Sequence, residues 1–350
     1  MSEQAAQDLR KGYEEIRQLL RRDIVGLDEV IRLLLTGIFS NGHCLLIGVP
    51  GLAKTRLIAT LSRLLEMDFS RIQFTPDLMP NDITGAEVIV EDKITGERQF
   101  EFMKGPIFAN IILADEINRT PPKTQASLME AMEERQVTSL GKRFDLDLPF
   151  FVLATQNPIE QEGTYPLPAA QLDRFFFSIN VDYPSLNDEA AIVRMATRPE
   201  MPAPKPVLSK TQVMAIMEDV QHGKVPEEVA RYATTLSRRS RPDDENAPAI
   251  VKKYVSYGAG PRASQALVMG AKVLAMLRGE SVPTCQDVRD LVAPVLRHRV
   301  VMNFLGAAEN RAVEDILERL VIEVPAPDRP AGFEEEKKGG LFSFFKRRAE

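Results

Sequence analysis

Residues 48–55 read GVPGLAKT, a stretch whose residue types and spacing suit the binding of nucleotide phosphates. In the general pattern G-x-x-x-x-G-K-[ST], backbone N–H groups hold the phosphates while the lysine reaches the β and γ positions. Gly48, Lys54 and Thr55 fit this pattern, but Ala53 stands where the second glycine is expected. The stretch is therefore a damaged site, a chance match or a working variant.

The flanking sequence predicts the elements that such a loop requires. HCLLI, just before Gly48, is an apolar run typical of a buried parallel strand, and RLIATLSRLLEM, just after Thr55, has apolar residues at helical spacing. A helix that begins at the loop would add converging N–H groups and a positive dipole end. Because Ala53 lies where the chain enters this helix, alanine is acceptable there if its φ is already helical.

Two further apolar runs end in polar residues that suit hydrolysis. NIILADEIN carries Asp115 and Glu116, which predicts one acid for Mg²⁺, shared with the Thr55 hydroxyl, and a second acid to orient the attacking water. FFVLATQNP carries Asn157, within reach of that water or of the γ-phosphate. A solvated strand end and an Asn-Pro turn are the ordinary alternatives, and the phosphate loop in the same chain favours the catalytic interpretation.

Two arginines stand in positions that suit phosphate contact. Arg174 lies in LPAAQLDRFFF, where a lone arginine is usually a surface ion-pair partner, but beside these motifs it predicts an arginine finger for the next subunit. Arg262 follows Pro261, a favourable first residue of a helix. Since cations are disfavoured at a helix N-terminus, a nucleotide phosphate is one candidate partner for Arg262.

Across residues 20–325 the sequence resembles the MoxR family of AAA+ ATPases. The matching stretches, in order, are IVGLDEV, GVPGLAKT, RIQFTPDLMPNDITGAEV, GPIFANIILADEINRTPPKTQASLMEAMEERQVT, ATQNPIEQEGTYPLPAAQLDRF and GPRA. The loop of this family commonly reads G-x-P-G-x-A-K-T, so Ala53 departs from the general loop but not from the family. The resemblance therefore indicates a working variant.

The resemblance implies roles for individual residues, with ATP and Mg²⁺ as cofactors. Asp115 and Glu116 would be the Walker B pair, Asn157 the sensor-1 residue, Arg174 the arginine finger and Arg262 the sensor-2 arginine, acting on its own or on a neighbouring nucleotide. The implied catalytic residues are Lys54, Glu116, Asn157, Arg174 and Arg262. Thr55 and Asp115 are the implied metal ligands. The implied nucleotide contacts are Ile24, Val25, Gly26, Gly48, Val49, Pro50, Gly51, Leu52, Ala53, Lys54, Thr55, Arg56 and Asp115. Arg119 is a further candidate for a subunit interface.

The expected fold is an α/β AAA+ P-loop core, a parallel sheet flanked by helices, followed by a small all-α lid. The predicted parts are a leading helix (1–22), the α/β core (23–197), a proline-rich linker (198–210), the helical lid (211–328) and a flexible tail (329–350). Within the core, EVIVEDKITGERQFEFMKGP and RQVTSLGKRFDLDLP alternate with period two and predict hairpins, the second turning at Gly141. The resemblance implies that they line the pore of a ring, and plain surface hairpins are the alternative.

The C-terminal residues depart from the family core. Two glycines precede Leu341, Phe342, Phe344 and Phe345, and basic residues 346–348 follow. An apolar tip with a basic end suits contact with a partner or with an anionic membrane surface. The alternatives are a disordered tail and one that folds back on its own domain.

Composition sets further limits. The 350 residues are 44% hydrophobic with a net charge of −6, which argues against a mainly electrostatic nucleic-acid binder. Cys44 and Cys285 give no disulfide framework, Cys44 suits a buried core, and the three histidines form no ligand cluster. The absence of an apolar leader or a 20-residue apolar run predicts a cytoplasmic protein.

The function implied by the resemblance is a ring-forming ATPase, expected to be a hexamer, that remodels or matures partner proteins as a chaperone. The implied partners are often proteins with a von Willebrand A domain. A chelatase-type ATPase subunit or a DNA-unwinding ring is a rival, against which FTPDLMPNDITG favours the MoxR family. A nucleotide-gated scaffold with little turnover is a second rival, and the joint presence of Glu116, Asn157 and Arg174 counts against it.

Overall fold

The computed structural model describes residues 3–49, 51–91, 98–139, 141–159, 163–197 and 202–327. The chain divides into two compact units, one made of Lys11–Met217 and the other of Met1–Arg10 with Glu218–Glu350. Helices α1 (Glu3–Leu20) and α8 (Lys210–His222) contribute residues to both units. The five-part division expected from the sequence stays a prediction, and the tail residues 341–348 lie outside the described residues.

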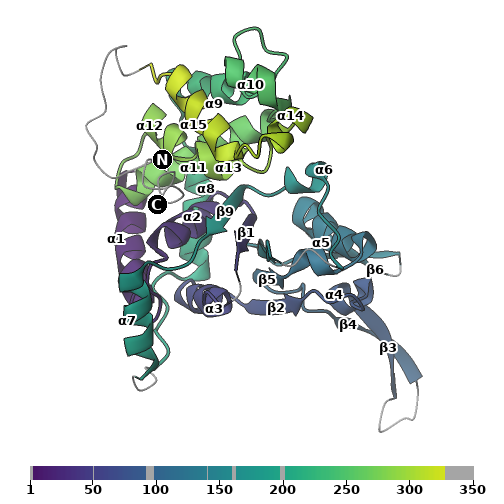
Figure 1. The fold of residues 1–350 in the computed structure, drawn as a ribbon. Helices are drawn as coiled ribbons and strands as arrows, with labels where there is room; N and C mark the ends of the chain where they lie inside the picture. The colour runs from purple at the N-terminus through teal and green to yellow at the C-terminus, as the bar shows by residue number, and fades with distance from the viewer. Residues whose placement is uncertain are drawn as a thin grey trace. The chain divides into compact units, whose positions relative to one another are not determined.

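The first unit is built on a five-stranded sheet in which every strand is parallel to its neighbours (Figure 1). From one edge to the other, the strands are β2 (Phe69–Gln73), β5 (Ile111–Asp115), β8 (Phe151–Gln156), β1 (Cys44–Gly48) and β9 (Phe177–Val181). The predicted α/β class is confirmed. Because the strands are parallel, their carboxyl ends meet at one edge of the sheet, where open α/β sheets bind their ligands.

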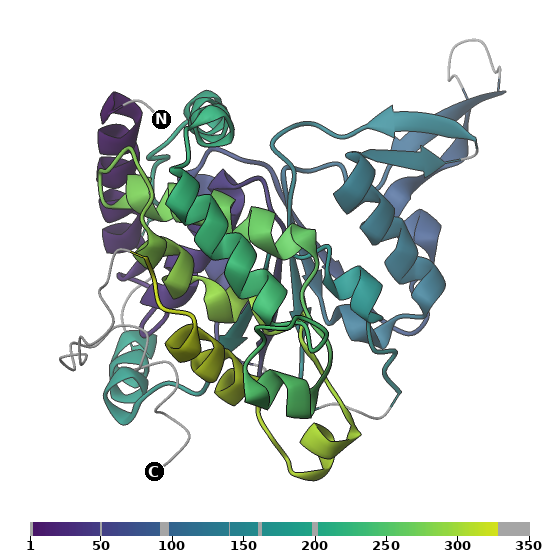
Figure 2. The same cartoon turned by 90° about the horizontal axis from the view of Figure 1, so that it is seen from above.

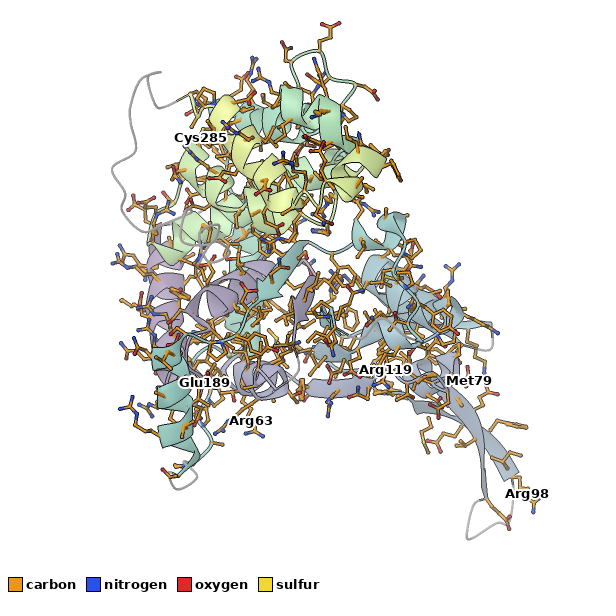
Figure 3. The ribbon with its side chains drawn as sticks, viewed as in Figure 1. Arg63, Met79, Arg98, Arg119, Glu189 and Cys285 are labelled. Atoms are coloured by element: carbon orange, nitrogen blue, oxygen red, sulfur yellow. The ribbon has the colours of Figure 1, made fainter. Side chains whose placement is uncertain are left out.

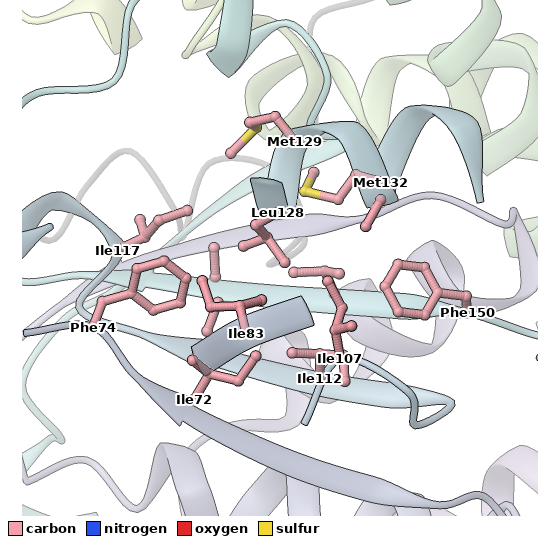
Figure 4. Packing of buried hydrophobic residues seen from close by; sticks show 14 of the residues in the cluster. Ile72, Phe74, Ile83, Ile107, Ile112, Ile117, Leu128, Met129, Met132 and Phe150 are labelled. Atoms are coloured by element: carbon pink, nitrogen blue, oxygen red, sulfur yellow. The ribbon is translucent and has the colours of Figure 1, made fainter. Parts of the chain in front are cut away.

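The strands β1, β5 and β8 are buried on both faces, which explains why they are continuous apolar runs rather than alternating ones. Leu45, Ile112 and Val152 share one face and pack in the cluster that includes Leu128 and Met132 of the covering helix α5, residues Pro122–Glu134 (Figure 4). Residues of the opposite parity, such as Leu46, Leu113 and Leu153, are also at most 1% exposed. Cys44 is fully buried, as its apolar run predicts.

The other helices of this unit connect the strands or flank them. They are α1 (Glu3–Leu20), α2 (Asp28–Phe39), α3 (Lys54–Leu64), α4 (Pro80–Thr84), the 3₁₀ helix η1 (Ile117–Arg119), α5 (Pro122–Glu134), α6 (Ala169–Leu172) and α7 (Leu186–Ala196). Helix α8 begins directly after Ser209, whose hydroxyl accepts from the Gln212 N–H at 3.2 Å. Ser209 therefore caps the N-terminus of this helix.

Two antiparallel hairpins accompany the sheet, as their alternating patterns predict. Strands β3 (Gly85–Glu91) and β4 (Arg98–Lys104) pair in register and extend away from the sheet in both views (Figures 1 and 2). Strands β6 (Gln136–Ser139) and β7 (Lys142–Asp145) form the second hairpin, and Gly141 has φ 76° at its turn. Arg98 marks the outer end of β4 (Figure 3).

The second unit is mainly helical, as expected. Its elements are α9 (Glu227–Arg239), α10 (Ala249–Tyr254), β10 (Val255–Tyr257), α11 (Pro261–Leu277), α12 (Cys285–Asp290), α13 (Val292–Leu296), β11 (Val301–Met302), α14 (Phe304–Ala308) and α15 (Val313–Glu323). The long helix α11 is buried along most of its length and packs against α9 and α12. No helix in the described part of the chain has the length and apolar character to cross a bilayer.

Candidate active site

The glycine-rich loop leaves the carboxyl end of β1 and enters α3, as the sequence predicts. Gly48 has no room for a side chain, since a Cβ there would lie 2.6 Å from the carbonyl oxygen of Val181 on the neighbouring strand. Gly51 has φ +86°, a conformation that glycine adopts without strain. Pro50 lies outside the described residues. In the described part of the loop, the local backbone structure therefore explains why each of these two positions is a glycine.

Ala53 does not meet the condition set for it above. Its φ of 52° and ψ of 25° place it in the left-handed region, at the N-cap of α3, rather than in a helical conformation. The chain enters the helix only at Lys54, one residue later. An L-residue in this region carries a cost of about 1–2 kcal/mol, which is the reason the general loop has glycine here. Strain of this size is typical of functional loops held by their surroundings.

Lys54 is half-buried, and its Nζ donates to the carbonyl oxygen of Gly48 at 2.5 Å. Burial lowers the pKa of Lys54, while the nearby charges of Asp115 and Glu116 act in the opposite direction. The charge of the lysine therefore interacts with the charges of both acids. A phosphate oxygen would be a charged alternative to the Gly48 carbonyl as an acceptor for this ammonium group.

Asp115 ends β5, and both of its carboxylate oxygens accept hydrogen bonds. Oδ1 accepts from the Thr155 hydroxyl at 2.7 Å, and Oδ2 accepts from Arg71 Nη2 at 2.6 Å. Arg71 and Thr155 come from β2 and β8, the two strands that flank β5. The carboxylate is thereby fixed from both sides of its strand.

Glu116 follows Asp115 in the left-handed conformation, with φ 59° and ψ 48°. Its Oε2 accepts from Gln73 Nε2 at 3.0 Å and from Arg119 Nη1 at 2.8 Å. Arg119, which ends η1 and is labelled in Figure 3, therefore pairs with an acid of its own chain. Its expected place at a subunit interface stays a prediction.

Three residues that were not predicted from the sequence contact these acids, namely Arg71, Gln73 and Thr155. Arg71 is the middle residue of β2 and Gln73 is its last, and Arg71 Nη2 also donates to Gln73 Oε1 at 2.5 Å. The register of β2 places Gln73 beside Asp115. The available signal was a polar residue within a strand, and it becomes informative only once the strand order is known.

Asn157 comes directly after β8 and is 7% exposed. Its Oδ1 accepts from the N–H of Ile159 at 3.1 Å, which is ordinary turn chemistry and also fixes the side chain. Since Asn157 follows the strand between β1 and β5, it lies at the same edge of the sheet as the loop and the acids.

Arg174, two residues after α6, contacts two residues of α5. Its Nη2 forms an ion pair with Glu133 at 2.7 Å, and its Nη1 donates to the Met129 carbonyl oxygen at 3.0 Å. Arg262 lies in the first turn of α11, after Pro261 at the start of the helix, and belongs to the other compact unit. The roles expected for both arginines stay predictions.

The expected nucleotide contacts Ile24, Val25 and Gly26 lie between α1 and α2. Ile24 is 3% exposed, and Gly26 has φ +78°. Arg56, in the first turn of α3, forms an ion pair of 3.0 Å with Asp23, which ties this segment to the helix that follows the loop. Nucleotide contacts are also expected at the loop positions Val49, Leu52 and Thr55, and these stay predictions.

Comparison with known proteins identifies the family. A family model described as "ATPase family associated with various cellular activities (AAA)" matches residues 43–177, and one for the AAA lid domain matches residues 247–320. The chaperone MoxR1 of Mycobacterium tuberculosis is 41% identical over 309 residues, covering 88% of this chain and 80% of its own. The chain belongs to the MoxR family of AAA+ ATPases. The protein MoxR of Paracoccus denitrificans is 29% identical, covering 83% of this chain and 89% of its own.

A solved structure matches most of the chain. A candidate ATPase from Cytophaga hutchinsonii superposes with a TM-score of 0.84 and 37% identity, covering 92% of this chain and 97% of that one. The fold class of an AAA core followed by an AAA lid is therefore confirmed. Membership of this ATPase family implies nucleotide binding.

Proposed function

We propose that the chain hydrolyses ATP with Mg²⁺ at the carboxyl edge of its parallel sheet. The observation that carries this proposal is the grouping of the loop and Lys54 with two acids at the end of β5. Lys54 and the loop amides would neutralise phosphate charge, Glu116 would accept a proton from the attacking water, and Asn157 would orient that water.

The donors available for a metal ion fit Mg²⁺. Mg²⁺ prefers oxygen ligands and commonly combines one or two protein groups with substrate phosphates and waters. The Thr55 hydroxyl and the Asp115 carboxylate are such oxygen donors, and Oδ1 of Asp115 is already oriented by Thr155. When bound, the ion would neutralise charge on the phosphate oxygens. We assign Thr55 and Asp115 as its ligands.

Full activity would require assembly of several copies. We assign Arg174 as a finger that acts on the nucleotide of the neighbouring subunit, in a ring that we expect to be a hexamer. Glu133 neutralises Arg174 within one chain, and this partially exposed ion pair would exchange for a phosphate contact at low cost. We assign Arg262 as the sensor of the nucleotide state in the helical unit.

The output we propose is remodelling or maturation of a partner protein. Support comes from the relatives, one of which is named a chaperone. The partner class we propose is a protein with a von Willebrand A domain. The β3–β4 hairpin, with Ile89 61% exposed and Phe100 73% exposed, offers apolar side chains for contact with a polypeptide.

The test is ATP turnover against protein concentration, with oligomer size measured in parallel. The wild type should gain specific activity as it assembles, whereas Arg174→Ala should assemble and lose turnover by about 10³-fold, as arginine fingers do elsewhere. Glu116→Gln should bind ATP and fail to hydrolyse it. Turnover that is absent, or that equals the turnover of Glu116→Gln, would disprove the hydrolytic function.

One observation favours a second candidate, a nucleotide-gated scaffold with little turnover. Both carboxylates of the proposed Walker B pair are held in ion pairs, Asp115 by Arg71 and Glu116 by Arg119. A chain that keeps these pairs after binding ATP would assemble without hydrolysis. ATP-dependent assembly without phosphate release would favour the scaffold.

A further inference from the structure

One buried hydroxyl group contacts both acidic residues at the end of β5. Thr155 is 1% exposed and lies in β8, directly beside β5. Its Oγ1 donates to Asp115 Oδ1 at 2.7 Å and accepts from the backbone N–H of Glu116 at 2.9 Å. A hydroxyl has one proton to donate and lone pairs to accept with, so this group serves both neighbours at once.

The hydrogen bond from the Glu116 N–H to the Thr155 hydroxyl lies just beyond the last paired residues of β5 and β8. The register between β5 and β8 has its last pair at Ala114 and Ala154. Two residues beyond Ala114, Glu116 leaves the extended conformation for the left-handed region. A buried backbone N–H needs a partner, and the Thr155 hydroxyl supplies one where the strand ladder has ended.

We propose that Thr155 is a positioning residue for the hydrolysis site, where it fixes the Asp115 carboxylate and the left-handed backbone of Glu116 together. This proposal rests on the proposed function of the same site. The bond to Oδ1 orients the carboxylate, so that Oδ2 points to the side where Arg71 now lies. The bond to the Glu116 N–H fixes the peptide from which the Glu116 side chain projects.

An ordinary structural role makes a different prediction. Threonine is β-branched and suits a buried strand, so packing alone would accept valine at this position. Thr155→Val keeps the branched shape and removes both hydrogen bonds. Thr155→Ser keeps the hydroxyl and removes a methyl group. Packing alone predicts that Thr155→Val is the milder change. The proposal predicts that Thr155→Ser is the milder change.

The experiment combines binding and turnover measurements on the full chain. Binding of a fluorescent ADP is titrated in EDTA and in Mg²⁺, and ATP turnover is measured against Mg²⁺ concentration. For Thr155→Val we expect unchanged ADP binding in EDTA, a smaller gain in affinity on adding Mg²⁺, and turnover about 10–100-fold lower, as for other groups that orient metal ligands. Thr155→Ser should stay within about threefold of the wild type in all three.

Thr36→Val is the matched control, because Thr36 is equally buried and its hydroxyl donates to the Arg32 carbonyl oxygen at 2.7 Å, away from both acids. This variant should keep the Mg²⁺ effect and the turnover. If Thr155→Val does not fold, Thr155→Cys, whose thiol is a weaker donor, is compared with Thr155→Ser.

Two results would overturn the proposal. One is wild-type turnover and a wild-type Mg²⁺ effect in Thr155→Val, and the other is equal values in the Cys and Ser variants. If the wild type itself fails to hydrolyse ATP, the proposed function fails. The Mg²⁺-dependent gain in ADP affinity then still decides the role of Thr155.

Discussion

Arg71 of β2 reaches the acid at the end of the neighbouring strand, with 2.6 Å between its Nη2 and Oδ2 of Asp115. One oxygen of the carboxylate that we assign to Mg²⁺ is therefore paired with a guanidinium group. The two groups compete for one carboxylate, because like charges cannot both approach it closely. In the structure, the charge of Asp115 is therefore neutralised by Arg71 of the same chain.

Removal of Arg71 should make the site easier to load with metal. The Arg71 side chain is 46% exposed, so the pair is worth up to about 1 kcal/mol after solvent screening. We expect Arg71→Ala to lower the Mg²⁺ concentration for half-maximal turnover by up to about fivefold. Arg63→Ala, on the exposed face of α3, makes the same charge change and should leave that concentration unchanged. An unchanged or higher Mg²⁺ requirement in Arg71→Ala would contradict competition.

Ala53→Gly should stabilise the protein, because glycine has no Cβ strain at φ 52°. Relief of about 1–2 kcal/mol is partly offset by the larger entropy of glycine in the unfolded chain, which leaves a gain of about 0.5–1 kcal/mol. Ala59→Gly, inside α3, should instead destabilise by about 0.5–1 kcal/mol. Urea unfolding of both variants measures the two signs, and equal destabilisation would show that Ala53 is not left-handed in solution.

His43 should make stability depend on pH. Its Nδ1 accepts from the Val152 N–H at 3.0 Å, so the proton lies on Nε2, which donates to the Met132 carbonyl oxygen at 3.1 Å. Burial, and then the charge of Arg135, hold the pKa of His43 well below its ordinary value of 6.5. The unfolded chain therefore binds the proton more readily, and stability falls as pH drops below about 6.5.

The expected loss from His43 is up to about 1.4 kcal/mol per pH unit between pH 6.5 and the lowered pKa. Urea unfolding at pH 7.5 and 5.5 measures it for the wild type, for His43→Gln and for His222→Gln, which removes an exposed histidine. His43→Gln should show a smaller difference between the two pH values, and His222→Gln should match the wild type. The same pH difference in all three would rule out His43 as the cause.

Mixing two inactive variants should restore activity if Arg174 acts on a neighbour. Glu116→Gln lacks the base but keeps the finger, and Arg174→Ala lacks the finger but keeps the base. In a closed ring with heterologous contacts, about one quarter of the sites in an equal mixture would contain both groups. Steady-state turnover of the mixture should therefore recover toward about one quarter of the wild-type rate.

Glu133→Gln is the control for Arg174, because it removes the ion-pair partner and keeps the finger. This variant should retain at least wild-type turnover. Assembly of the mixed variants without any recovered turnover would place Arg174 in the active site of its own chain or outside it.

Local sequence determined the chemistry of this protein, since the loop at Gly48–Lys54 and the acids Asp115 and Glu116 depend on residue types at fixed short spacing. It also determined the buried parallel sheet, because continuous apolar runs suit strands covered on both faces. Tertiary structure alone decided that β8 lies between β1 and β5, and so which side chains meet the acids. Arg71, Gln73 and Thr155 reach them from strands distant in sequence, and strand order depends on crossovers that no local pattern records. The left-handed conformations of Ala53 and Glu116 were equally hidden, because local preference opposes them and only surrounding contacts hold them in place.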